Sequence, residues 1–226
     1  MIVEICVNSI QSALNAIAGG ATRIELCQNL EKGGITPDIA EIHTVCTELP
    51  LDVMVLVRPR FGNFHYSSKV WNQLENSALI TSHMGAKGIV TGMLDRDGNV
   101  EVNLLKKLVR LLRENGKDVT FHRAFDRCRD WRTAMEQIID CGFTRILTSG
   151  QATTAEKGIP TLAQMVRQAD GRIKIMAGGG ITSDNARRIV DLTGVDEIHA
   201  SCKINIRGTL ATNTLEVRRL IKAVNN

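Results

Sequence analysis

Short runs of β-branched and other apolar residues alternate along the chain with longer segments whose apolar residues recur every three to four positions. The short runs have the length and composition of β-strands, and the longer segments have the periodicity of amphipathic helices. Each run is long enough to cross a sheet. Eight of them are candidate strands, at residues 2–7, 23–27, 52–57, 88–92, 118–122, 145–149, 172–176 and 196–201.

The helical segments begin and end at residues that favour helix boundaries. Ser9 can cap a helix that ends at Gly19, and Thr36 with Pro37 predicts the start of another. Strands that alternate with helices over the whole chain imply a parallel sheet. Eight such units predict an α/β protein in which residues 1–226 form a single closed (β/α)8 TIM barrel domain. An open, doubly wound sheet is the main alternative fold.

A short pattern, Gly-apolar-x-x-Ile, recurs four times and supports the barrel. Its copies begin at Gly20, Gly85, Gly142 and Gly194. Each copy lies where a predicted helix ends and an even-numbered strand begins, about two βα units after the copy before it. Glycine suits this place because the residue after a helix often adopts the left-handed conformation.

The repeat also predicts which side chains face the barrel interior. Its isoleucines should pack against the outer helices, so the alternation along a strand turns the next residue inward. Because burial of unpaired polar groups costs free energy, polar residues gathered at inward positions indicate a functional site or an ion-pair network. The upper interior is expected to hold Glu4, Cys6, Glu25, Cys27, Arg58, His122, Ser149, His199 and Ser201.

Composition and charge narrow the class of protein. Hydrophobic residues make up 43% and charged residues 23% of the chain, as is typical of a globular protein. The net charge of +4 comes from basic residues spread along the sequence, so we expect no nucleic-acid partner. No secretory signal and no membrane-spanning stretch is evident, and we expect no membrane partner. Six cysteines without a CxxC spacing are expected to be reduced thiols in the cytoplasm.

Glycine and arginine residues at the predicted strand ends indicate an anion site. Active sites of (β/α)8 barrels lie at the carboxyl ends of the strands, and a phosphate site often follows strands 7 and 8. Gly179 and Gly180 follow predicted strand 7, and residues 182–184 are expected to open a helix whose amides point at the anion. Arg58 and Arg60 can add fork-shaped contacts. We therefore expect these two glycines and two arginines to bind a small anion.

The inward charged side chains leave two interpretations open. In the catalytic interpretation His122, Glu4 and Glu25 exchange protons with a substrate that Arg123 contacts. Burial and neighbouring charges can bring the pKa of an imidazole or a carboxyl group toward neutrality. In the structural interpretation the glutamates only neutralise inward-facing cations, namely Arg58 and Lys174 or Arg145.

Two cysteines suggest a third interpretation, a metal site. Cys6 and Cys27 end adjacent predicted strands, and each follows a glutamate and an apolar residue. Neighbouring strands lie about 4.8 Å apart, so two thiols at similar height can share one soft ion. A buried cysteine is also an ordinary small core residue. Cys46 and Cys141 fall in helical segments and are expected to belong to the core.

The motifs quoted next resemble, in order, those of the CutC family of copper homeostasis proteins. They are EICVNS, GATRIELC, GGITP, RPRFGNFHYS, TGMLDRDGNV, TFHRAFD, LTSG, MAGGGI and EIHAS, and they span nearly the whole chain. The resemblance implies a TIM-type barrel, a cytoplasmic location, a role in copper handling and a homodimer or homotetramer. It also implies that Cys6 and Cys27 bind Cu(I). The stretch after Ser201 is the least similar to the family.

Two functional hypotheses follow. The first is a cytoplasmic copper homeostasis protein that binds Cu(I) at the barrel mouth. The second is a TIM-barrel enzyme that acts by acid–base chemistry on a small anionic, possibly phosphorylated, metabolite.

Overall fold

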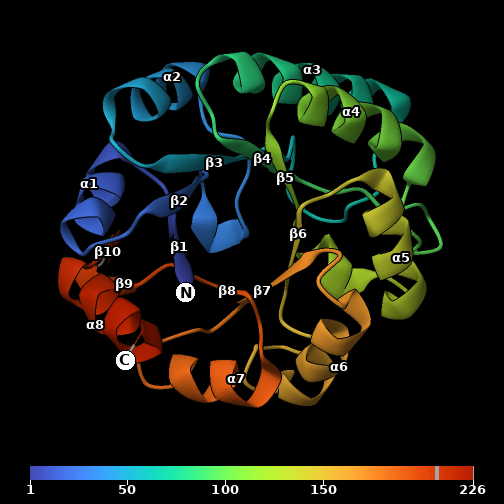
Figure 1. Ribbon diagram of the computed structural model, residues 1–226. Coiled ribbons are helices and arrows are strands. Elements are labelled where there is room, and N and C mark those ends of the chain that lie inside the picture. The colour runs from blue at the N-terminus through green and yellow to red at the C-terminus, as the bar shows by residue number, and fades with distance from the viewer. Residues whose placement is uncertain (207–208, 226) are drawn as a thin grey trace.

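Eight parallel strands close into a barrel with helices around it, as Figure 1 shows in a view along the barrel axis. The computed structural model describes residues 1–206 and 209–225. The eight strands follow one another around the ring in chain order, and β8 pairs with β1. The α/β class and the (β/α)8 barrel expected from the sequence are confirmed. The barrel strands are β1 Ile2–Val7, β2 Arg23–Leu26, β3 Asp52–Leu56, β4 Gly88–Thr91, β5 Asp118–Phe121, β6 Arg145–Thr148, β7 Lys174–Gly178 and β8 Glu197–Ala200.

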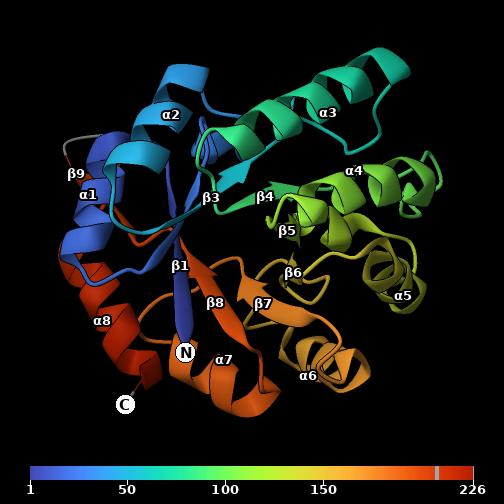
Figure 2. The same ribbon diagram turned by 45° about the horizontal axis from the view of Figure 1, so that its top comes forward.

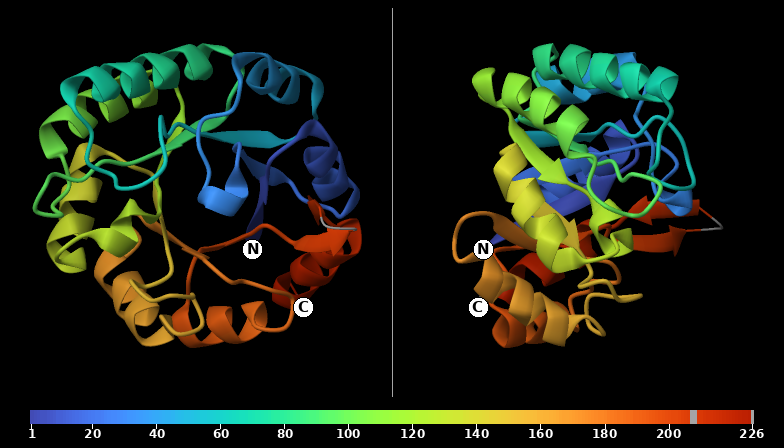
Figure 3. Two further views of the ribbon diagram at one scale, coloured as in Figure 1. Left: turned by 180° about the vertical axis from the view of Figure 1, so that it is seen from behind. Right: turned by 90° about the vertical axis from the view of Figure 1, so that its right-hand side faces the viewer.

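Helices cover the outer face of the barrel, and Figure 2 shows them as a ring of tilted rods around the strands. Two short 3-10 helices, η1 Leu30–Lys32 and η2 Arg123–Arg127, follow β2 and β5. The loop that contains η1 crosses the opening of the barrel seen from behind in Figure 3. The outer helices are α1 Ile10–Ala18, α2 Ile39–Glu48, α3 Ser68–His83, α4 Val102–Glu114, α5 Trp131–Cys141, α6 Ile159–Ala169, α7 Ala186–Thr193 and α8 Thr214–Asn225.

The four repeated glycines have the backbone conformation that the repeat predicts. All of them have a positive φ, with values from 69° at Gly194 to 99° at Gly20. At Gly142 the glycine is the C-cap of α5, and its N–H donates to the carbonyls of Ile138 and Ile139. A left-handed glycine therefore ends the helix and sends the chain into the next even-numbered strand.

Two helix starts differ from the expectation. Helix α2 begins at Ile39 with Asp38 as its N-cap, so Thr36 and Pro37 precede the helix. Thr36 instead pairs with the chain after β3: its side-chain oxygen accepts a hydrogen bond from the Arg58 N–H, at 2.9 Å. Helix α7 begins at Ala186, so residues 182–184 precede it, and a turn over residues 183–185 leads into the helix.

The core has an outer part between strands and helices and a smaller part inside the barrel. The isoleucines of the repeat are all fully buried in the outer part, as expected. The inner apolar cluster is separate and consists of Cys6, Cys27, Met54, Leu56 and Val90. Polar side chains share the rest of the interior with Leu147 and Met176, and the buried charged groups lie inside the ring of strands.

The last part of the chain departs from the simple βα pattern. After β8 the strands β9 Lys203–Ile206 and β10 Thr209–Thr212 form an antiparallel hairpin beside α8. Residues 207 and 208, within the stretch least similar to the CutC family, lie outside the described residues. Among the described residues, no helix combines the length and apolar character needed to cross a membrane.

Candidate functional site

A layer of ion pairs fills the lower end of the barrel. Glu197 on β8 accepts hydrogen bonds from Arg23 on β2 and from Arg145 on β6, the latter at 2.9 Å between Nε and Oε2. Lys174 adds a contact at 3.4 Å. The side chains of Glu197, Arg23 and Arg145 are at most 5% exposed. This arrangement of two guanidinium groups around one carboxylate satisfies charges that would otherwise be costly to bury.

The pairing corrects the structural interpretation of the sequence. Lys174 and Arg145 do pair with a glutamate, but that glutamate is Glu197 and neither Glu4 nor Glu25. Arg23 and Glu197 were overlooked as interior residues. The signal was present, because each lies two positions before an inward residue of its strand and therefore shares its face.

Above this layer, Glu4 and His199 form a hydrogen-bonded pair on adjacent strands. Glu4 Oε1 lies 2.9 Å from His199 Nδ1, and Glu4 Oε2 accepts from Arg23 Nε at 2.7 Å. Burial opposes the charged carboxylate, yet the hydrogen bond with His199 and the charge of Arg23 hold the pKa of Glu4 below its usual value. Burial likewise opposes the imidazolium, but the charge of Glu25 and the bond with Glu4 raise the pKa of His199.

A cavity of about 390 Å³ opens above these residues at the carboxyl ends of the strands. It brings together Cys6, Glu25, His122 and most of the predicted anion ligands. Glu4, Cys27 and Arg60 are absent from its lining, although Glu4 contacts the lining residue His199. The lining residues are Cys6, Glu25, Leu30, Gly33, Leu56, Arg58, Phe64, His122, Arg123, Leu147, Gly179, Gly180, Ile181, His199, Ala200 and Ser201.

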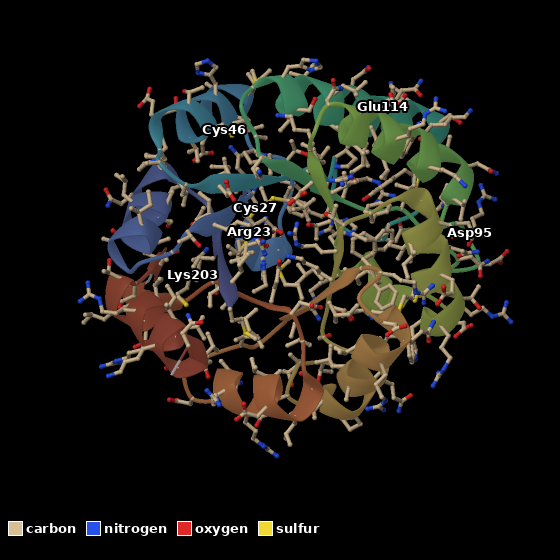
Figure 4. The ribbon with its side chains drawn as sticks, viewed as in Figure 1. Arg23, Cys27, Cys46, Asp95, Glu114 and Lys203 are labelled. Atoms are coloured by element: carbon tan, nitrogen blue, oxygen red, sulfur yellow. The ribbon has the colours of Figure 1, made fainter. Side chains whose placement is uncertain are left out.

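Cys6 and Cys27 form a pair of thiols beside the cavity, and of the two only Cys6 lines it. Their Sγ atoms are 3.7 Å apart, and Cys6 Sγ lies 3.5 Å from Glu25 Oε1. Ligand atoms of Cys6, Cys27 and Glu25 all lie within 4.8 Å of one another. The hydrogen bond with Cys27 and burial raise the pKa of Cys6 well above its usual value. Figure 4 shows Cys27 near the centre of the barrel, whereas Cys46 lies in the outer ring on α2.

Glu25 is a buried carboxyl group with one oxygen that finds no partner. The residue is 5% exposed, and no described group forms a hydrogen bond with its Oε2. Burial raises the pKa of Glu25 to about 7, although the charge of His199 acts in the opposite direction. A carboxyl group in this condition can accept or donate a proton near neutral pH.

His122 presents a neutral imidazole to the cavity. Its Nδ1 accepts a hydrogen bond from the Ala124 N–H at 3.2 Å, which leaves the ring proton on Nε2. Among the described residues this Nε2 has no hydrogen-bond partner. Burial, together with the positive charge of Arg58, lowers the pKa of His122 to about 3. The Nε2–H group is therefore a buried donor without an acceptor.

His122 is expected to stay neutral far below the pH at which an ordinary histidine takes up a proton. In the unfolded chain it titrates near pH 6.5, so between about pH 6.5 and its folded pKa of about 3 the unfolded state binds more protons. Its contribution to the free energy of unfolding is fully present above pH 6.5. This contribution falls by about 1.4 kcal/mol per pH unit as the pH is lowered through that window.

Imidazole ¹⁵N chemical shifts and urea unfolding at several pH values measure this behaviour. Replacement of His122 by phenylalanine should remove this part of the pH dependence. Protonation of the folded-state imidazole near pH 6.5 would contradict the assignment.

Arg58 is a buried cation without a buried counter-charge. Its guanidinium group donates to the carbonyls of Gly33, Gly34 and Gly62, at 2.8 to 3.1 Å. The residue is 6% exposed, and no described carboxylate lies within 4.0 Å of it. These three bonds fix the guanidinium at the rim and tie the loops after β2 and β3 together. No carboxylate of the described residues compensates its positive charge.

The other predicted anion ligands lie in two places. Arg123 donates to Asp126 at 2.7 Å and to Ser149 at 2.9 Å, so its charge is neutralised. Gly179, with φ of 102°, lies against this guanidinium: a Cβ there would lie 3.1 Å from its Cζ. Arg60 donates to loop groups outside the cavity lining, including the carbonyl of His65 at 2.6 Å.

Comparison with known proteins identifies relatives that belong to one family. The CutC family model matches residues 1–204. A CutC family protein of Vibrio cholerae serotype O1 is 44% identical over 201 residues, which are 89% of this chain and 79% of the relative. One from Parabacteroides distasonis is 43% identical over 203 residues, with 89% and 83% covered.

Solved structures agree with the sequence relatives. The CutC structure of Streptococcus agalactiae superposes with a TM-score of 0.83 at 29% identity, covering 89% of this chain and 98% of that one. Phosphoribosylanthranilate isomerase of Pyrococcus furiosus, at 14% identity and a TM-score of 0.66, covers all of this chain and 99% of that one. This second likeness concerns the barrel fold alone.

Proposed function

The chain belongs to the CutC family, and from this premise we propose that it serves copper homeostasis by binding Cu(I) through Cys6 and Cys27. The relative from Streptococcus agalactiae carries the name of a copper homeostasis protein. The observation that carries the proposal is the separation of 3.7 Å between the two thiol sulfur atoms beside the cavity. The proposal includes a cytoplasmic location and a homodimer or homotetramer, both of which rest on the family resemblance.

The donor set fits a soft metal ion. Two sulfur atoms that bind one ion at about 2.3 Å each lie about 3.8 Å apart at a tetrahedral angle and about 4.6 Å apart when they oppose each other. The distance between Cys6 and Cys27 matches the short end of this range. Thiolates are the ligands that Cu(I) prefers.

The wild-type protein is expected to bind one Cu(I) per chain in an anaerobic competition titration. The measurement uses reduced protein and a coloured Cu(I) chelator, and follows the loss of the chelator complex. Because Cu(I) is satisfied by few thiolate ligands whereas Zn(II) takes four, Zn(II) at the same concentration should compete poorly. Failure of the protein to withdraw Cu(I), or equal displacement by Zn(II), would count against a copper site.

A second candidate function is an enzyme that acts on a small anionic metabolite, and the cavity favours it. Arg58 supplies an uncompensated positive charge there, and Glu25 and His122 present buried atoms without partners. In this function Glu25 exchanges the proton, Glu4 orients His199, and Arg123 with Gly179 and Gly180 contacts the substrate. The lowered pKa of His122 replaces the acid–base role expected from the sequence by that of a neutral hydrogen-bond donor. Substrate turnover that survives replacement of Cys27 by serine would separate this activity from copper binding.

A further inference from the structure

Half of the buried polar atoms without a partner gather at one cavity. In the described part of the chain, six buried side-chain nitrogen or oxygen atoms have no hydrogen-bond partner, and three of them belong to residues that line the 390 Å³ cavity. Each such atom lowers the free energy of unfolding, because it has lost its hydrogen bonds to water without gaining a partner in the protein. The six are Glu25 Oε2, Arg58 Nε, His65 Nδ1, Tyr66 Oη, His122 Nε2 and Thr212 Oγ1.

Two of the three cavity atoms are hydrogen-bond donors, on side chains that pack against the same aromatic ring. The ring of Phe64 is 4.7 Å from Arg58 Cζ and 4.9 Å from the His122 ring, so both groups pack on the same side chain. Arg58 Nε carries a hydrogen in every state, and the Ala124 bond to Nδ1 places one on His122 Nε2. Among the described residues neither hydrogen finds an acceptor of good geometry, although the Tyr66 hydroxyl interacts with the Arg58 side chain.

The charge of this corner selects the kind of acceptor. Arg58 is fully charged and His122 is neutral, so the corner carries one net positive charge. A buried charge is stable only when it is paired. An anionic oxygen satisfies both donors and the charge at once, whereas a neutral carbonyl satisfies only the donors.

The shape and lining of the cavity select the rest of the ligand. A volume of 390 Å³ corresponds to roughly a dozen water-sized groups at about 30 Å³ each. Apolar walls from Leu30, Leu56, Leu147 and Ile181 suit a hydrocarbon portion. A small organic molecule with one acidic group has both properties, and pockets of this kind combine apolar walls with a few fixed polar groups.

We propose that the cavity binds a small organic acid whose oxyanion accepts a hydrogen bond from His122 Nε2 and pairs with the positive charge of Arg58. The oxyanion is a carboxylate or a phosphate, since both offer the same acceptor chemistry. The site does not depend on Cu(I), because neither donor belongs to the thiol pair. This proposal names the substrate class of the second candidate function, and it does not require the first candidate function, copper binding.

Ligand titrations followed by the His122 ¹⁵N shifts test the proposal. The probes are benzoate, inorganic phosphate and, as a neutral match for benzoate, benzamide. Benzoate or phosphate is expected to shift the Nε2 signal in a saturable way, and benzamide to bind at least about tenfold more weakly. A response to benzoate alone identifies a carboxylate site, and a response to phosphate alone identifies a phosphate site.

Variants locate the binding. Replacement of Arg58 by methionine should weaken anion binding by about ten- to a hundredfold, since a hydrogen bond to a charged group is lost. Because Arg58 also ties two loops, Gly92→Ala provides a second variant: its Cβ would lie 2.7 Å from His122 Nδ1 and displace the ring. Arg60→Gln, outside the lining, is the control and should bind like wild type.

For the variants that lack an unambiguous His122 signal, calorimetry with the same probes gives the affinity. Thermal unfolding shows whether each variant is folded. The proposal is overturned if neither anion perturbs His122, if benzamide binds as well as benzoate, or if both folded variants keep wild-type affinity.

Discussion

A chain in which Cys6 and Cys27 are both replaced by serine is expected to lose Cu(I) affinity by roughly a thousandfold or more, which is about 4 kcal/mol. Serine keeps nearly the size of cysteine and offers a hard oxygen in place of a soft sulfur. The two sulfur atoms lie 3.7 Å apart, and no other cysteine belongs to a described cluster of metal-ligating groups. Each single variant should retain part of the affinity, because one thiolate remains.

The control is the double replacement of Cys46 and Cys141 by serine. Both cysteines lie in outer helices, α2 and α5, and their replacement removes the same number of thiols from the chain. A competition titration against a Cu(I) chelator measures all variants. Equal affinity of the two double variants would show that the thiols bind copper without a specific site, and would remove the main support for the copper proposal.

Replacement of Glu197 by alanine is expected to lower the free energy of unfolding by about 3–5 kcal/mol. Burial opposes the charged form, yet hydrogen bonds and charges from Arg23 and Arg145 lower the pKa of Glu197 to about 2. Without this carboxylate, Arg145 and Arg23 are left as buried cations, of which only Arg23 keeps a second buried carboxylate, that of Glu4. Small domains are stable by about 5–15 kcal/mol, so a large share of the stability is at stake.

Glu136 offers a matched control for this ion pair. It binds Arg172 at 2.7 Å, but both side chains are 45% exposed. An exposed pair contributes about 1 kcal/mol or less, so Glu136→Ala should shift the urea midpoint only slightly. If Glu197→Ala shifts the urea midpoint no more than Glu136→Ala does, the buried ion pairs do not contribute more to stability than an exposed pair.

The architecture could be predicted from the sequence because it depends on local patterns. Apolar runs gave the strands, and the left-handed glycines at Gly142 and Gly194 gave the helix ends, which the structure confirms. The alternation along strands correctly turned Glu25 and His122 toward the interior. That residues 1–226 form one domain stays a prediction.

The pairing of charges could not be predicted, because it depends on how strands are staggered around the closed ring. The register places Glu4 beside Arg23 on one side and beside His199 on the other, and no local signal encodes this. For the same reason Arg58 was expected to pair with a glutamate, whereas it binds loop carbonyls brought near by the β2–α2 and β3–α3 connections. The start of α2 was misjudged because Thr36 bonds to a distant strand end.

The layer of Arg23, Arg145 and Glu197 determines the route by which a ligand enters and leaves the barrel. These side chains are each at most 5% exposed and fill the lower end of the barrel. A ligand in the cavity therefore leaves through the same opening by which it entered. Cys6 lines the same cavity, so an ion held between it and Cys27 would use this mouth as well. A metal ion and an organic acid would then share a single entrance.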